Sequence, residues 1–176
     1  MQQESTDDGK NDRYVLSALV DNHSGVLSRV SGLFSRRGFN IESLTVGETY
    51  DNTRSCMTIV VSGDEHILEQ ITKQLSKLIE VLSITHCQGA TSVMREMALI
   101  KVKAGADTRH SVMEAANIYR ARIVDVAPQS VIIEATGSED KIASLIRFLE
   151  PIGILELVRT GITAMVRGST AASLAR

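Results

Sequence analysis

The chain alternates apolar runs with amphipathic stretches, and the clearest example lies near its start. Residues 14–20 are almost continuously apolar, which predicts a buried strand. Apolar residues then recur at steps of three and four, which predicts a helix: Val26, Leu27, Val30, Leu33 and Phe34. Residues 21–26 therefore form a strand-to-helix turn. The helix should end at residues 36–38, where two arginines precede a glycine.

The remainder of the first half predicts two more strands, a helix and a closing strand. Residues 40–49 and 54–61 read as strands joined by a polar turn at 50–53, which makes a hairpin. Residues 62–64 open a helix with one apolar face: Ile67, Leu68, Ile71, Leu75, Leu78 and Ile79. Residues 81–87 form the last strand. The order β-α-β-β-α-β is that of a ferredoxin-like domain.

The second half repeats this order. We expect strands at residues 96–102, 121–127, 130–136 and 154–160, and helices at 108–119 and from Ser138 to the stop at Pro151. No Asn-Gly turn follows the first strand of this half. The predicted fold is therefore α+β, with two ferredoxin-like βαββαβ domains whose antiparallel sheets carry helices on one face.

The patterns divide the chain into five segments. We expect a disordered tail at residues 1–12, a first domain at 13–88, a connector at 89–94, a second domain at 95–168 and a disordered tail at 169–176. A domain of about 75 residues gains only a few kcal/mol from its core, so such modules often oligomerise. In this fold the second strand lies at a sheet edge. We therefore expect residues 40–49 of two chains to pair into an eight-stranded sheet.

Composition narrows the classes of function. The 176 residues are 43% hydrophobic with a formal net charge of −2, which gives no general attraction to nucleic acid or to an anionic membrane. The polar, acidic first ten residues do not resemble a signal peptide, so we expect a cytoplasmic protein. Cys56 and Cys87 are predicted to be buried, reduced thiols. His86 and His110 lack companions at metal-ligand spacing, so no metal is expected.

Candidate chemistry concentrates in the turn at residues 21–26. Asn22 and Ser24 are helix-capping residue types, and Gly25 lets the backbone come close to a ligand. Free N–H groups of Ser24, Gly25 and Val26 at a helix start would attract a small carboxylate. Simpler interpretations remain open at this stage. Asn22 could be only a cap, Gly25 only a packing glycine, Asn40 a strand-entry residue and His23 a solvated loop side chain.

Two longer segments carry a family resemblance. Residues 21–30 (DNHSGVLSRV) and 33–46 (LFSRRGFNIESLTV) resemble the small regulatory subunit of acetolactate (acetohydroxyacid) synthase. A strand followed by an Asn-x-x-Gly turn and a helix would suggest only an ACT domain, and residues 38–46 narrow it to this family. Residues 95–96, 119–126 and 159–161 are similar to the second domain of the same family. The resemblance extends over residues 13–168.

The resemblance implies a regulatory subunit without catalytic activity. It implies binding to, and activation of, a large catalytic subunit, and feedback inhibition by valine or another branched-chain amino acid. Thiamine diphosphate, Mg and FAD would belong to the large subunit, with no cofactor in this chain. The effector would lie between two ACT domains of a homodimer, in contact with these residues: Asn22, His23, Ser24, Gly25, Val26, Asn40 and Ile41. His23 replaces an acidic residue that is common in the family, which affects the local charge of the site.

Other functions have less support in the sequence. A free-standing enzyme would need a nucleophile–base pair, a metal cluster or a phosphate-binding loop, and no such motif is recognisable. A transcription module would bring a DNA-binding helix or a basic patch, which the charge balance does not offer. The remaining alternative is a stand-alone amino-acid-sensing ACT module that regulates another enzyme.

Overall fold

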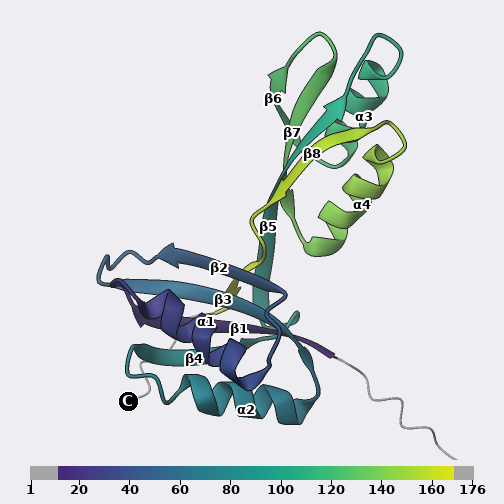
Figure 1. Cartoon of the computed structure of the whole chain (residues 1–176). Coiled ribbons are helices and arrows are strands. Elements are labelled where there is room, and N and C mark those ends of the chain that lie inside the picture. Colours follow the sequence, from purple (N-terminus) through teal and green to yellow (C-terminus); the bar gives the residue numbers. More distant parts are fainter. Residues whose placement is uncertain (1–11, 169–176) are drawn as a thin grey trace, which may run out of the picture. The chain divides into compact units, whose positions relative to one another are not determined.

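The computed structural model describes residues 12–168, and these divide into two compact units (Figure 1). The first unit runs to Val93 and also includes the described residues from Ala164 onward; the second unit spans Met94–Thr163. Each unit has its own sheet and its own core. The expected tail at residues 169–176 lies outside the described residues, as do residues 1–11, whereas Asp12 is the first residue of a strand.

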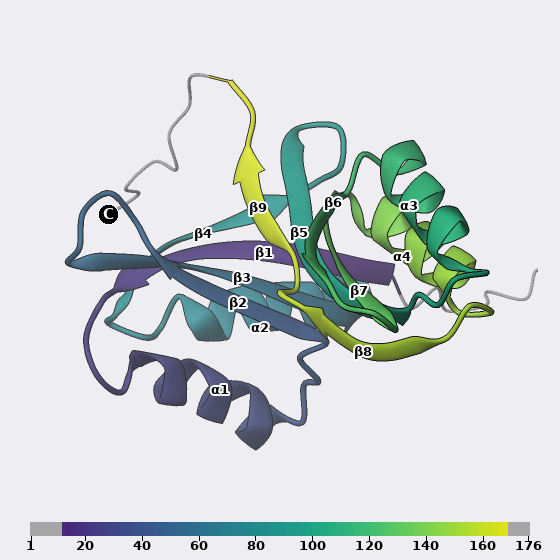
Figure 2. The same ribbon diagram turned by 90° about the horizontal axis from the view of Figure 1, so that it is seen from above.

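The first unit has the βαββαβ order that the sequence predicted. Its elements are β1 (Asp12–Asp21), α1 (Val26–Arg37), β2 (Ser43–Glu48), β3 (Arg54–Gly63), α2 (Glu65–Leu75) and β4 (Val81–Cys87). The strands form an antiparallel sheet in the order β2-β3-β1-β4, so β2 is an edge strand. Both helices cover the same face of the sheet (Figure 2). Every second residue of β1 and β3 enters the core beneath them, as a half-buried strand requires.

The second unit repeats the arrangement. Its elements are β5 (Ser92–Lys103), α3 (Arg109–Ile118), β6 (Arg122–Val126), β7 (Ser130–Gly137), α4 (Glu139–Leu149) and β8 (Ile154–Arg159). The antiparallel order is β6-β7-β5-β8. A separate core of aliphatic residues lies between this sheet and its two helices. The predicted fold of two ferredoxin-like domains is therefore confirmed.

One strand was not predicted. β9 (Thr163–Val166) follows the last expected strand and pairs with β5. The N–H of Ala164 donates to Thr58 Oγ1 at 3.4 Å, and the N–H of Arg167 donates to the carbonyl of Thr91 at 2.8 Å. Thr58 is buried although it lies on the sheet face away from the helices. Four residues give too short a pattern to predict a strand, and their partners are distant in sequence.

The start of β2 differs from the prediction. The expected strand began at residue 40, but the ladder begins with Ser43 opposite Val60, and Asn40 and Ile41 lie in the connection before it. Gly38 ends α1 in the left-handed conformation at φ 71°, and the N–H of Phe39 then donates to the carbonyl of Phe34 at 3.0 Å. Residues 39–42 therefore connect the capped end of α1 to the first paired residue of β2, Ser43.

Candidate functional site

The turn at residues 22–25 connects β1 to α1, and its first residues are fixed by backbone bonds. The N–H of Asp21 donates to the carbonyl of Glu80 at 2.9 Å, and the N–H of Asn22 donates to the carbonyl of Thr53 at 2.7 Å. Thr53 belongs to the tight connection between β2 and β3. These two bonds attach the beginning of the turn to the residue preceding β4 and to the β2–β3 connection, which restricts how far its residues can move.

The side chain of Asn22 points to the hairpin and does not cap the helix. Its Nδ2 donates to the carbonyl of Asn52 at 2.8 Å and to Glu48 Oε1 at 3.1 Å. Both amide hydrogens are thereby used, and no hydrogen bond within residues 12–168 reaches Oδ1. An amide held in this way presents an acceptor to an incoming ligand, and the acceptor suits an ammonium group. The interpretation of Asn22 as only a helix cap is wrong.

Glu48 is a neighbour that sequence reasoning missed. It ends β2 opposite Ser55, next to the pairing of Asp21 with Arg54, and this register brings it to Asn22. The strand ends were the available signal, because the end of β1, the start of β3 and the end of β2 meet at the same end of the sheet. An exposed carboxylate here adds to the attraction for a positive group.

Gly25 has a conformational role. Its φ of 91° and ψ of −14° lie in the left-handed region, where side chains are disfavoured. A Cβ built on it would meet no heavy atom within 4 Å, so Gly25 is not a packing glycine. It precedes α1 without any side-chain cap, although Ser24 is adjacent. His23 is exposed, and its Nδ1 lies 3.0 Å from the carbonyl of Ser24.

The beginning of α1 keeps its positive end open. The first intrahelical bond in this turn runs from the N–H of Arg29 to the carbonyl of Gly25 at 3.0 Å, and the first helical turn contains no acidic residue. By contrast, α2 has Asp64 as a cap, with Ile67 N–H donating to it at 2.7 Å, and α4 has Ser138. The N–H of Val26 makes a long bond to the carbonyl of His23 at 3.5 Å, whereas the N–H groups of Ser24 and Gly25 have no hydrogen bond within the described residues. These two amides and an uncompensated helix dipole suit an anion.

Asn40 and Ile41 lie at the other end of α1. Asn40 is exposed, and Ile41 packs partly against the first core. At 1.5 Å per residue the helix separates the two ends by about 18 Å. The structure thus brings Asn22, His23, Ser24, Gly25 and Val26 together with Glu48, but it does not bring Asn40 and Ile41 of the same chain to them.

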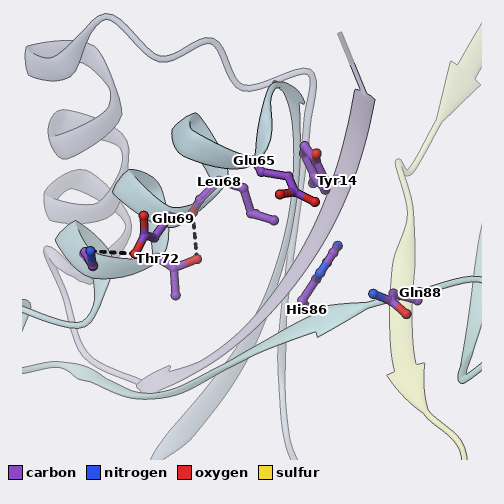
Figure 3. Close-up of a pocket in the computed structure, with 8 residues that line it drawn as sticks. Tyr14, Glu65, Leu68, Glu69, Thr72, His86 and Gln88 are labelled. Atoms are coloured by element: carbon purple, nitrogen blue, oxygen red, sulfur yellow. Dashed lines mark hydrogen bonds and ion pairs between the residues drawn. The ribbon is translucent and has the colours of Figure 1, made fainter. Parts of the chain in front are cut away.

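A separate hollow in the first unit lies between α2 and the ends of β1 and β4. Its volume is about 600 Å³, and Tyr14, Glu65, Leu68 and His86 line it (Figure 3). The Tyr14 and His86 rings meet edge to face, and burial raises the pKa of Tyr14. Glu65 lies in the first turn of α2, where the helix dipole favours it. The positions of the polar side chains in this hollow are therefore explained by the local structure of α2 and by the contact of the two rings.

The corresponding turn of the second unit is built differently. It leads from β5 into α3, whose first residue Arg109 donates from Nη2 to the carbonyls of Ala104, Ala127 and Pro128, each at 2.8 Å. This side chain ties the turn to the β6–β7 connection. No residue in this turn corresponds to the Asn-x-x-Gly arrangement of residues 22–25.

Two further findings concern the described residues alone. Within residues 12–168, no three His, Cys, Asp or Glu side chains are grouped so as to hold a metal ion. In the same part of the chain, no helix combines the length and the apolar character needed to span a membrane.

Comparison with known proteins agrees with this architecture. A family model described as an AHAS small subunit-like ACT domain matches residues 16–83, and one described as the small subunit of acetolactate synthase matches residues 95–168. The chain is similar to the acetolactate synthase small subunit of Mycobacterium bovis, at 54% identity over 88% of this chain and 92% of the relative. It is also similar to the probable small subunit of Archaeoglobus fulgidus, at 52% identity over 89% and 98%.

A solved structure extends the match to three dimensions. The crystal structure of the acetolactate synthase small subunit from Thermotoga maritima aligns with a TM-score of 0.84 at 40% identity, over 90% of this chain and 99% of that chain. Sequence identities of 40–54% over 88–90% of this chain establish the family. The chain belongs to the family of acetolactate synthase small, regulatory subunits.

Proposed function

We propose that this chain binds the large catalytic subunit of acetolactate synthase in the cytoplasm, raises its activity and makes it sensitive to a branched-chain amino acid, most often valine. It performs no catalysis itself. Thiamine diphosphate, Mg and FAD are held by the large subunit, where they supply the chemistry of the reaction. This chain contributes effector recognition and a change in the state of its partner.

We place the effector at the seam between the ACT domains of two chains. The position of the two candidate groups at opposite ends of α1 carries this proposal, because a helix of 12 residues is about 18 Å long. One amino acid cannot contact Gly25 and Asn40 of the same chain at once. When two β2 edges pair antiparallel about a two-fold axis, the start of α1 in one chain meets the end of α1 in the other. Each dimer then has two equivalent effector sites.

The geometry of the turn suggests how the two charged groups of the effector are recognised. The carboxylate takes the free N–H groups at the start of α1, where each bond to a charged group contributes roughly 1.5–3 kcal/mol. Because Asn22 Nδ2 already donates to the hairpin, its Oδ1 accepts from the ammonium, assisted by Glu48. Asn40 and Ile41 of the partner subunit complete the site with polar and apolar contacts.

The effector acts by shifting a population of dimer arrangements. A ligand that bridges two chains favours the arrangement in which its contacts to both chains are made. That arrangement holds the large subunit in a less active state. A coupling of roughly 1–3 kcal/mol is enough to change activity 5- to 150-fold.

The test combines binding and reconstitution. Calorimetry on the full chain should show valine binding that Asn22→Ala weakens at least tenfold, about 1.4 kcal/mol. Asn117→Ala is the matched control, because this exposed amide lies in the second unit and should leave binding unchanged. Valine should also inhibit the large subunit reconstituted with this chain, and the chain alone should not turn over pyruvate.

Four results would contradict the proposal. Turnover by the purified chain would exclude a purely regulatory role. Valine binding that survives Asn22→Ala would remove this turn from the site. Valine binding without any effect on the large subunit would favour the stand-alone sensing module. Equilibrium sedimentation that shows a stable folded monomer, with and without valine, would exclude a site shared between chains.

A further inference from the structure

Glu80 is a buried carboxylate next to the turn at residues 22–25. It precedes β4, and its side chain is 5% exposed. The Arg29 guanidinium donates from Nη1 to Glu80 Oε1, and 61% of the Arg29 side chain remains exposed. A buried carboxylate is costly unless it is paired, and Arg29 supplies the partner of Glu80.

The contacts of Glu80 reach both ends of the turn. Its backbone carbonyl accepts from the N–H of Asp21, immediately before Asn22. Its carboxylate binds Arg29, whose own N–H donates to the carbonyl of Gly25. One residue therefore connects to the first residue before the turn and, through Arg29, to the last residue within it. Glu80 thus links the residues on both sides of the turn at residues 22–25.

The direction of the Arg29 side chain follows from helix geometry. In an α-helix, side chains tilt toward the N-terminus, so Arg29 covers the turn that precedes its own position. Its guanidinium thus holds the first turn of α1 to Glu80 without occupying the backbone amides of that turn. The amides remain available, and their position relative to the sheet is fixed.

We propose that the Arg29–Glu80 ion pair positions the turn at residues 22–25, holding Gly25 and the open amides of α1 in the geometry that receives the effector. Both are positioning residues, since they act through the turn and not through the ligand. This inference rests on the proposed function for its consequence, a loss of effector affinity. Its structural part, the fixing of the turn, does not depend on which effector binds.

The matched control comes from the second unit. Glu96 is equally buried, with a side chain 3% exposed, and pairs with Arg159 through two donors. This pair connects β5 to β8 and has no contact with the turn. Removing either carboxylate deprives a fold of one buried ion pair, but only Glu80 is connected to residues 22–25.

The experiment compares Glu80→Gln with Glu96→Gln in the full-length chain. Hydrogen exchange measured on backbone amides reports local opening, and amides of β3 report the stability of the whole first unit. We expect exchange at the hydrogen-bonded amides that frame the turn, those of Asn22 and Arg29, to accelerate at least tenfold relative to β3 in Glu80→Gln and to stay unchanged in Glu96→Gln. Calorimetry with valine should show an at least fivefold weaker affinity in Glu80→Gln alone.

The outcomes separate this inference from the proposed function. If Glu80→Gln leaves the exchange of the Asn22 and Arg29 amides unchanged relative to β3, the positioning role is wrong. If exchange accelerates but valine affinity is retained, the ion pair fixes the turn but this does not support effector binding. The inference is then overturned. If the unmodified chain does not bind valine at all, the proposed function fails while the exchange result still decides whether the pair fixes the turn. Arg29→Gln removes the same pair through a largely exposed side chain and replaces Glu80→Gln if that variant does not fold.

Discussion

Replacing Gly25 by alanine tests the conformational requirement of the turn. The residue has φ 91° and ψ −14°, and the added methyl group would meet no heavy atom within 4 Å. The cost is therefore conformational and not steric. An L-residue in the left-handed region costs about 1–2 kcal/mol, and the reduced entropy of the unfolded chain offsets about 0.4–1 kcal/mol of this. The expected net loss in the free energy of unfolding is about 1 kcal/mol.

Urea unfolding measures this loss as a lower transition midpoint at an unchanged slope. Gly38→Ala is the control for strain, because Gly38 has φ 71° and equally open space at the other end of α1. The two variants should lose similar stability. A loss above about 3 kcal/mol in Gly25→Ala alone would mean that the turn packs against atoms, which contradicts an open turn.

Valine binding is measured without urea, where the variant is folded, so that the loss of stability does not affect the measured affinity. The methyl group of Gly25→Ala would project beside the open amides of α1, and relaxation of the strain would rotate those amides. We expect valine affinity to fall at least tenfold, about 1.4 kcal/mol. Full valine affinity in a folded Gly25→Ala variant would refute the reasoning that these amides receive the carboxylate.

Three further changes have defined outcomes. Val46→Lys adds a charge to the exposed edge strand β2, and like charges across a two-fold axis should weaken dimerisation in sedimentation experiments; an unchanged dimer would place the interface elsewhere. Hydrogen bonds from the Thr53 hydroxyl and N–H hold the pKa of Asp51 below its usual value, so its contribution to stability is present above about pH 3.8 and lost as the pH falls through the folded-state pKa. Urea midpoints of the unmodified chain and of Asp51→Asn should therefore differ at pH 7 and converge in acid, and a constant difference would contradict this. Asp64→Ala removes the cap of the Ile67 N–H and should lower the free energy of unfolding by about 1 kcal/mol, with no change in valine affinity.

Much of the fold followed from local pattern. The period of apolar residues located α1, and four of the five residues in the pattern are buried, because a helix on a sheet has to bury one stripe: Val26, Val30, Leu33 and Phe34. The fifth, Leu27, is 46% exposed. Repetition of the βαββαβ order showed that the second half folds like the first. β9 escaped prediction because a four-residue strand has no detectable period, and its partners lie far away in the chain.

By itself the sequence determined the turn, an Asn-x-x-Gly segment between a strand and a helix. Only the tertiary structure decided that Asn22 directs its amide nitrogen to the hairpin and that Glu48 and Glu80 lie beside the turn. Backbone propensity and apolar period act over a few neighbouring residues, so they are readable in order along the chain. The contact of Asn22 with Glu48 and the contacts of Glu80 with Asp21 and Arg29 depend on sheet register and on the packing of distant segments, which no local pattern encodes.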